Sequence, residues 1–162
     1  MAKKILLETR AEPAFFTLVG ISCHLLDYRL LYDFNKQLDF NFNKERDFTP
    51  TSMTPEENSS FSFYIYKDED TRNSYYLLAN KNPDIYLLPA LKQADFLLFI
   101  EGPLSKIRQE TLLNGIRSIQ KVLTAFEIKF NQVKNYENLL TDIELHIMNI
   151  AKESKQEFNK II

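Results

Sequence analysis

The residues with the greatest chemical potential lie near the start of the chain, where Cys23, His24 and Asp27 follow a run of β-forming residues. A cysteine at the N-terminus of a helix has a lowered thiol pKa and can serve as a nucleophile. Neighbouring helical residues point about 100° apart, however, so His24 is poorly placed to act as a base for Cys23. A single free cysteine usually has a packing role, and we therefore predict no catalytic residue.

Asp27 is the more informative acid. On a helical wheel it falls inside the apolar arc that contains Leu30 and Phe34, so its carboxylate should face a sheet or its rim. An unpaired buried carboxylate is costly, and Asp27 therefore needs a cation, backbone amides or a ligand as its partner. A structural pair near the start of the helix is the simplest interpretation. The candidate site at this helix start comprises four residues: Cys23, Asp27, Tyr28 and Arg29.

Four further side chains complete the candidate ligand or interaction residues. Asp95 precedes a buried apolar run, where an acid that closes a turn is the simplest interpretation. Tyr64, Tyr66 and Tyr76 fall on two predicted strands and are candidates for one face of a sheet. If that face is open, the rings form an aromatic patch suited to a protein partner, whereas if helices cover it they belong to the core.

Glycine content and ligand spacing argue against a cofactor or a metal. The chain has 3 glycines, which cannot build the phosphate-binding loops of Rossmann or Walker enzymes. Cys23, His24 and Asp27 form one short cluster, but a zinc site usually draws a second ligand pair from elsewhere. We therefore predict no cofactor and no metal. The remaining histidine, His146, is expected at a solvated edge of the last helix.

Composition limits the partners and the compartment. The formal net charge is -2 and no run of Lys and Arg occurs, so a nucleic-acid partner is not expected. One cysteine precludes a disulfide within the chain and fits a reducing compartment. The apolar runs at 5–7 and 96–100 are too short for a signal-peptide core or a membrane span. The expected location is cytoplasmic, with no membrane partner.

The first half of the chain predicts strands around one helix. Apolar β-formers over 15–22 predict a strand, and Ser22 is expected to cap a helix over 23–38. The polar stretch 43–60 lacks periodicity and predicts a long loop, with Phe48 and Met53 as its apolar anchors.

Short strands follow that loop. Alternating residues over 61–66 and 74–79 predict a β-hairpin. Two further short strands are predicted at 4–8 and 85–88.

The second half predicts a buried strand and two helices. Residues 94–100 are apolar without alternation, which is typical of a central strand covered on both faces. Apolar residues at helical spacing predict one helix from Pro103 to Phe126, in which Gly115 is tolerable only if close packing requires it. A capping-box pattern at Thr141 predicts a last helix from about Asp142. Its apolar stripe is narrow: Ile143, Ile147, Ile150, Phe158 and Ile161.

These elements together predict an α+β fold with a largely antiparallel sheet packed by amphipathic helices. A single domain is expected over 1–140, and a C-terminal helical extension over 141–162. A narrow stripe of this kind suits docking in one groove or pairing with a second copy.

Four segments in this order resemble the IPExxxVDY family of Bacteroidota proteins: FTLVGIS at 16–22, DYRL at 27–30, YYLLAN at 75–80 and LPALKQADF at 88–96. The resemblance covers roughly the first 140 residues. In the segment that names the family only Pro89 and Asp95 match, and Ala90 stands where the family has its Glu. The resemblance implies a compact cytosolic bacterial protein and brings no activity with it. The helix after Thr141 is similar to no part of the family.

Two functions remain open at this stage. The leading hypothesis is a non-enzymatic protein-interaction or scaffold domain that self-associates, as a homodimer for example, through a sheet face or the last helix. The alternative is a small ligand-binding domain or enzyme with a pocket near the start of the first helix. A deep pocket with Asp27 unpaired would favour the alternative, and a closed salt bridge without a cavity would exclude it.

Overall fold

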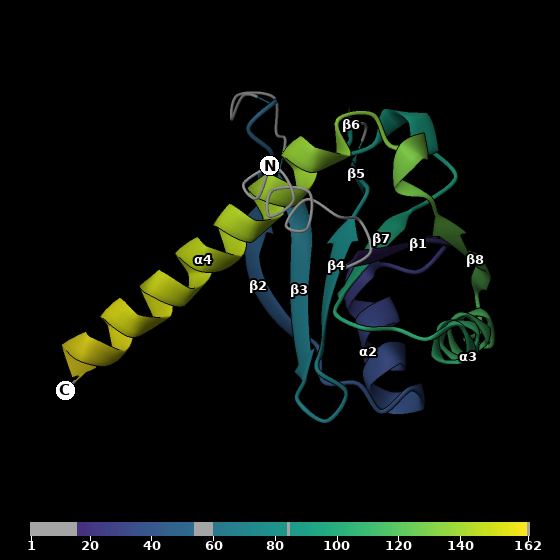
Figure 1. Ribbon diagram of the computed structural model, residues 1–162, viewed down its shortest axis with the longest axis horizontal. Coiled ribbons are helices and arrows are strands. Elements are labelled where there is room, and N and C mark those ends of the chain that lie inside the picture. The colour runs from purple at the N-terminus through teal and green to yellow at the C-terminus, as the bar shows by residue number, and fades with distance from the viewer. Residues whose placement is uncertain (1–15, 54–59, 84, 162) are drawn as a thin grey trace, which may run out of the picture.

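The computed structural model describes residues 16–53, 60–83 and 85–161, and within these ranges it confirms the predicted α+β class. Six strands form one antiparallel sheet in the order β2-β3-β4-β7-β1-β8 (Figure 1). Their bounds are β1 (Phe16–Cys23), β2 (Asn43–Phe48), β3 (Phe61–Asp68), β4 (Asn73–Ala79), β7 (Phe96–Glu101) and β8 (Val122–Ile128). The helices are α2 (Asp27–Gln37), α3 (Lys106–Arg117) and α4 (Tyr136–Ile161), with short 3-10 turns η3 (Pro89–Leu91) and η4 (Phe130–Gln132).

Helices cover both faces of the sheet and divide the core into two halves. Leu30 and Phe34 of α2 pack with Ile116 of α3 on one face. Leu139 and Ile143 of α4 pack on the other. Figure 1 shows α4 crossing its face of the sheet and continuing past the edge formed by β2.

The buried central strand is confirmed. β7 lies between β4 and β1, and residues 96–100 are all buried. Its uninterrupted apolar sequence follows from this position, because each side chain enters one half of the core. The predicted hairpin is also present as β3 and β4.

The predicted start of the first helix is wrong. β1 continues through Ser22 to Cys23, and α2 begins only at Asp27, with Leu26 in the N-cap position. Ser22 pairs with Thr124 of β8, so the residue expected to cap a helix lies in the sheet instead. Tertiary pairing with β8 thus overrides the local capping signal.

The single long helix predicted up to Phe126 is also wrong. α3 ends at Arg117, and residues 122–128 form the edge strand β8. The apolar residues of β8 happen to continue the helical spacing of those in α3, which led to the prediction of one helix. In the structure these residues form a strand that pairs with β1. Gly115 does meet a close neighbour, since a Cβ there would lie 2.9 Å from Leu38 Cδ2.

The stretch predicted as a polar loop contains a strand. Residues Asn43–Phe48 form β2 at the other edge of the sheet, with Phe48 1% exposed and Met53 packed against the same core half. The short strand predicted at 85–88 is confined to β6 (Ile85–Tyr86), which pairs with β5 (Lys81–Asn82). The strand predicted at 4–8 lies outside the described residues.

The last helix begins at Tyr136, earlier than predicted. Thr141 lies within it and its Oγ1 donates to Glu137 O at 2.9 Å, so no capping box forms. Ile143 is buried and Ile147 and Ile150 are half-buried, as the stripe predicts. Beyond Ile150, every side chain that the structure describes is exposed. The side chains of Phe158 and Ile161 lie outside the described part. None of the helices in the described ranges combines the length and apolar character needed to cross a bilayer.

Candidate functional site

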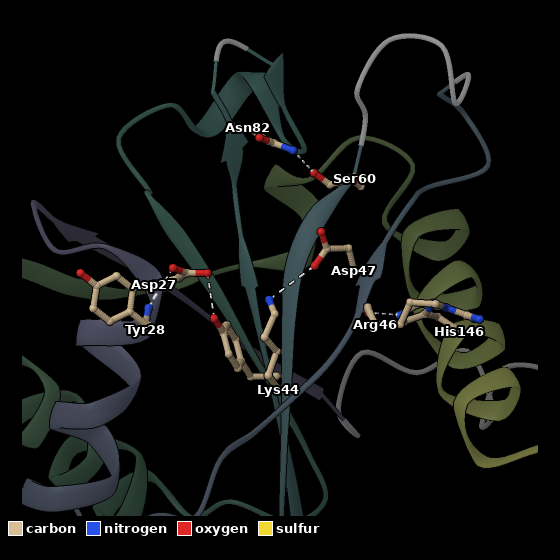
Figure 2. A network of polar contacts seen from close by, with 9 residues as sticks. Asp27, Tyr28, Lys44, Arg46, Asp47, Ser60, Asn82 and His146 are labelled. Atoms are coloured by element: carbon tan, nitrogen blue, oxygen red, sulfur yellow. Dashed lines mark hydrogen bonds and ion pairs between the residues drawn. The ribbon is translucent and has the colours of Figure 1, made fainter. Parts of the chain in front are cut away.

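A cavity of about 540 Å³ opens at the end of the sheet where β1 stops and α2 begins. Seven polar or reactive side chains line it: Cys23, His24, Asp27, Ser62, Lys81, Asn82 and Asp95. They come from β1, the β1–α2 connection, α2, β3, β5 and the residue before β7, so the sheet topology brings together positions far apart in the chain. Asn82 donates to Ser60 O and ties the adjacent turn to the start of β3 (Figure 2).

Asp27 has protein partners at both carboxylate oxygens. Its Oδ2 accepts from the Tyr64 hydroxyl at 2.8 Å and its Oδ1 accepts from the Tyr28 backbone N–H at 2.8 Å (Figure 2). Burial opposes its ionisation, but these hydrogen bonds and the nearby Lys44 outweigh burial and hold the pKa of Asp27 below its usual range. Burial and the bond to Asp27 raise the pKa of Tyr64. The predicted need for a partner is met by a tyrosine. Asp27 is therefore neither unpaired in a pocket, which would favour a ligand-binding site, nor in a closed salt bridge without a cavity, which would exclude one.

Cys23 lies at the end of a strand, which removes the activation expected from a helix N-terminus. Its side chain is 4% exposed, and burial raises the pKa of its thiol. Its backbone N–H donates to Asp95 Oδ2 at 2.9 Å, and Lys81 Nζ lies 3.8 Å from Asp95 Oδ1. Asp95 therefore fastens the end of β1 to the start of β7, and its charge adds to the effect of burial in raising the pKa of the thiol beside it.

Tyr28 and Arg29 point away from the cavity. Tyr28 is 66% exposed, and Arg29 lies 3.9 Å from Asp33 in the i,i+4 pair that their spacing indicates. The Arg29 guanidinium also lies 5.6 Å from the ring centroid of Tyr32, which is itself exposed. These residues form the outer face of α2, and among the residues of α2 only Asp27 lines the cavity.

The three candidate tyrosines do not share a sheet face. Tyr66 pairs across the hairpin with Tyr75, so Tyr64, Tyr66 and Tyr75 lie on the α2 side. Tyr76 lies on the opposite side, stacked on Phe63 at 6.2 Å, with its hydroxyl bonded to Glu101. Tyr64 and Tyr76 are each 3% exposed, so of the two alternatives, an open aromatic patch or rings covered as part of the core, the structure supports the second for these two rings.

His146 is a structural residue that the sequence interpretation missed. It is 8% exposed rather than solvated, and its Nε2 bonds to Arg46 O at 2.8 Å (Figure 2). Its ring packs edge-on against Phe48 and Phe63, and burial lowers its pKa. The Arg46 side chain pairs with Glu153 of α4. A signal was present, since position 146 falls inside the apolar stripe at i+3 from Ile143.

No group of three or more His, Cys, Asp or Glu side chains in the described ranges is arranged to hold a metal ion. No model of a known protein family matches this chain, and no curated protein matches it. Membership of the IPExxxVDY family thus stays a prediction. The two residues that match its naming segment have clear local roles, because Pro89 begins η3 and Asp95 holds the end of β1.

Proposed function

We propose that this chain is a non-enzymatic protein-interaction domain that associates with a second copy of itself through the projecting half of α4 (residues 151–161). The observation that carries this proposal is that α4 docks on the sheet over its first half and then leaves the domain with its described side chains exposed (Figure 1). The sheet-face route to association is not proposed, since the strand tyrosines lie in the core.

The projecting half is long enough to form an interface. Eleven residues of helix extend about 16 Å at roughly 1.5 Å per residue. Its Glu153 pairs with Arg46 of β2, but its described side chains are all exposed. A helical segment that buries so little is marginally stable in water, so a partner that covers one face would favour it. In the sequence, the helical spacing of apolar residues that begins at Ile143 continues at Phe158 and Ile161. This spacing favours an apolar contact with a partner helix along the same side.

A groove of about 360 Å³ lies where α4 leaves the sheet and offers a seat for the second helix. Its apolar lining comprises Ile65 of β3 with Ile147, Ile150 and Ala151 of α4. Beyond it the helix carries interspersed charges, Lys152, Glu153, Lys155 and Glu157, so two identical helices would not repel each other strongly.

The state of the cavity residues supports a role without catalysis. The Cys23 thiol is buried with a raised pKa, and both oxygens of Asp27 are occupied by protein donors. An activated nucleophile needs a lowered pKa or an adjacent base, which this arrangement does not supply at Cys23.

Light scattering after size exclusion tests the proposal on the full chain and on a truncation ending at Ile150. The truncation must not end earlier, because Ile143 is 0% exposed in the core. We expect the truncation to have a lower mass, counted in chains, than the full chain, because it lacks the helical segment that forms the proposed interface. Leu145→Ala, at an exposed position on the docked half, is the matched control and should not change the mass. Equal masses for the full chain and the truncation would refute the role of the projecting half.

A small-ligand site is the second candidate, favoured by the cavity and by its convergent Lys81, Asp27 and Asp95. A thermal-shift screen with small primary amines and small carboxylic acids tests it. A ligand that stabilises the wild type but not the Asp27→Asn variant would support this function. Absence of any shift across both classes would remove it.

A further inference from the structure

β8 is an edge strand with little charge, and its register with β1 is irregular between Ser22 and Cys23. It hydrogen-bonds to β1 on one side and ends the order of strands in the sheet. One of its seven residues is charged, and Leu123 is 62% exposed. Natural edge strands usually carry charges, bulges or covering segments, because open backbone groups invite pairing with another strand.

The geometry shows which backbone groups face outward. Ala125 lies opposite Ile21 of β1, and Ile21 O accepts from Asp95 N, on the β7 side. Ile21 therefore directs its hydrogen bonds away from β8, and the N–H and C=O of Ala125 point away from β1. Ala125 is nevertheless 0% exposed, so its backbone groups become accessible to another strand only when the covering side chains move. By the same alternation, the backbone groups of Glu127 point outward as well.

Arg117 occupies one of these outward groups. Its Nε donates to Ala125 O at 2.9 Å, and its Nη1 lies 3.2 Å from Asn114 Oδ1. The side chain is exposed and comes from the end of α3. A side-chain N–H thus stands where the backbone N–H of a neighbouring strand would bond, and it can swing aside when such a strand arrives.

We infer that β8 pairs antiparallel with β8 of a second copy, about a two-fold axis at Ala125. In that register Ala125 meets its own counterpart, and Glu127 lies opposite position 123 of the other copy. Glu127 Oε1 accepts from Lys129 Nζ of its own chain at 2.9 Å. The Arg117 released from Ala125 O then adds a second cation beside the second copy's Glu127 carboxylate. Because the pairing is two-fold, it forms two such ion pairs, and this charge complementarity selects a second copy as the occupant.

This surface is separate from the projecting half of α4. α4 passes the β2 edge of the sheet, whereas β8 forms the opposite edge (Figure 1). The β8 pairing does not depend on the proposed function, but together the two surfaces let copies add at both ends of a dimer. A scaffold built by open-ended addition follows from their opposite placement.

Charge reversal at the two residues tests the pairing by sedimentation velocity over a dilution series of the full chain. We expect R117E alone and E127R alone to lose one step of association, because each places like charges together. An equimolar mixture of R117E and E127R should regain it, since each reversed charge meets its opposite on the other copy. K106E, an exposed reversal at the start of α3, is the matched control and should behave like the wild type. L123K is a second way to block the edge without altering Arg117.

The masses separate this inference from the proposed role of α4. If both hold, the wild type exceeds a dimer and R117E is a dimer. If only the β8 pairing holds, the wild type is a dimer and R117E a monomer. The inference is overturned if R117E, E127R and L123K all keep the wild-type mass, or if the mixture fails to restore what the single reversals lose.

Discussion

The two edges of the same sheet are treated in opposite ways. In β2, four of six residues are charged, the register with β3 is irregular between Glu45 and Phe48, and Arg46 is engaged by α4. In β8, one of seven residues is charged, the register with β1 is irregular between Ser22 and Cys23, and a single guanidinium occupies the outward carbonyl of Ala125. The two edges thus differ mainly in charge, which is one of the usual means of preventing strand addition. The β2 side is therefore suited to helix pairing and the β8 side to strand pairing.

The largest expected effect concerns the anchor that holds the protected edge in place. Phe48 is 1% exposed and packs against Phe63 and His146, so it joins β2 and α4 to one core half. Phe48→Ala should lower the free energy of unfolding by about 3–5 kcal/mol, as expected for loss of a buried phenylalanine. Urea denaturation measures the change.

The matched substitution at the open edge should have little effect. Leu123→Ala removes a side chain that is 62% exposed, and the expected change in unfolding free energy is within about 0.5 kcal/mol. Similar losses for the two variants at a dilution where the chain is monomeric would mean that Leu123 is buried within the single chain, and that the contrast between the edges is wrong.

A glycine behind the open edge should give an effect smaller than that of Phe48→Ala. A Cβ at Gly20 of β1 would lie 2.8 Å from Phe126 Cζ and 2.9 Å from Ile128 Cδ1. Gly20→Ala therefore displaces the Phe126 ring, with an expected loss of about 1–3 kcal/mol in urea denaturation. The same substitution in a Phe126→Ala background should cost less, because the ring that must move is absent. An unchanged cost in that background would place the strain elsewhere.

The contrast between the edges also explains what sequence alone could predict. β7 was predictable because burial on both faces leaves an uninterrupted apolar run. β2 could not be predicted, because its charged residues reflect an exposed position at the sheet edge and show no alternation typical of a strand. β8 was missed because its apolar residues continue the helical spacing of α3.

The candidate site depends on the same long-range pairing. Cys23 and Asp95 are 72 residues apart, and their hydrogen bond follows only from the register of β1 with β7. Asp27 could be predicted to need a partner, since its helical position faces the rim. That the partner is Tyr64 required knowing that α2 lies over β3 and β4. The face of Tyr76 could not be assigned without the hairpin register, which pairs Tyr66 with Tyr75.

The smallest effect expected is a pH dependence confined to the protected edge. Burial lowers the pKa of His146, and the positive charge of Arg46 lowers it further. The hydrogen bond to the Arg46 backbone carbonyl and the negative charges of Glu153 and Asp47 act in the opposite direction, but the net shift is downward. In the unfolded chain the imidazole titrates near about 6.5. Below that pH the unfolded chain binds a proton that the folded chain resists, so the free energy of unfolding falls as the pH is lowered.

Hydrogen exchange on the wild type and His146→Gln at pH 7.5 and 5.5 measures this effect. In the wild type, the amides of β2 and of the docked half of α4 should lose protection at the lower pH relative to those of β8. His146→Gln should reduce that difference, because its amide does not titrate. His24→Gln is the matched control, since it removes the chain's other imidazole, which is exposed. Equal loss of protection at both edges would mean that the imidazole acts on global stability and not on the β2 edge alone.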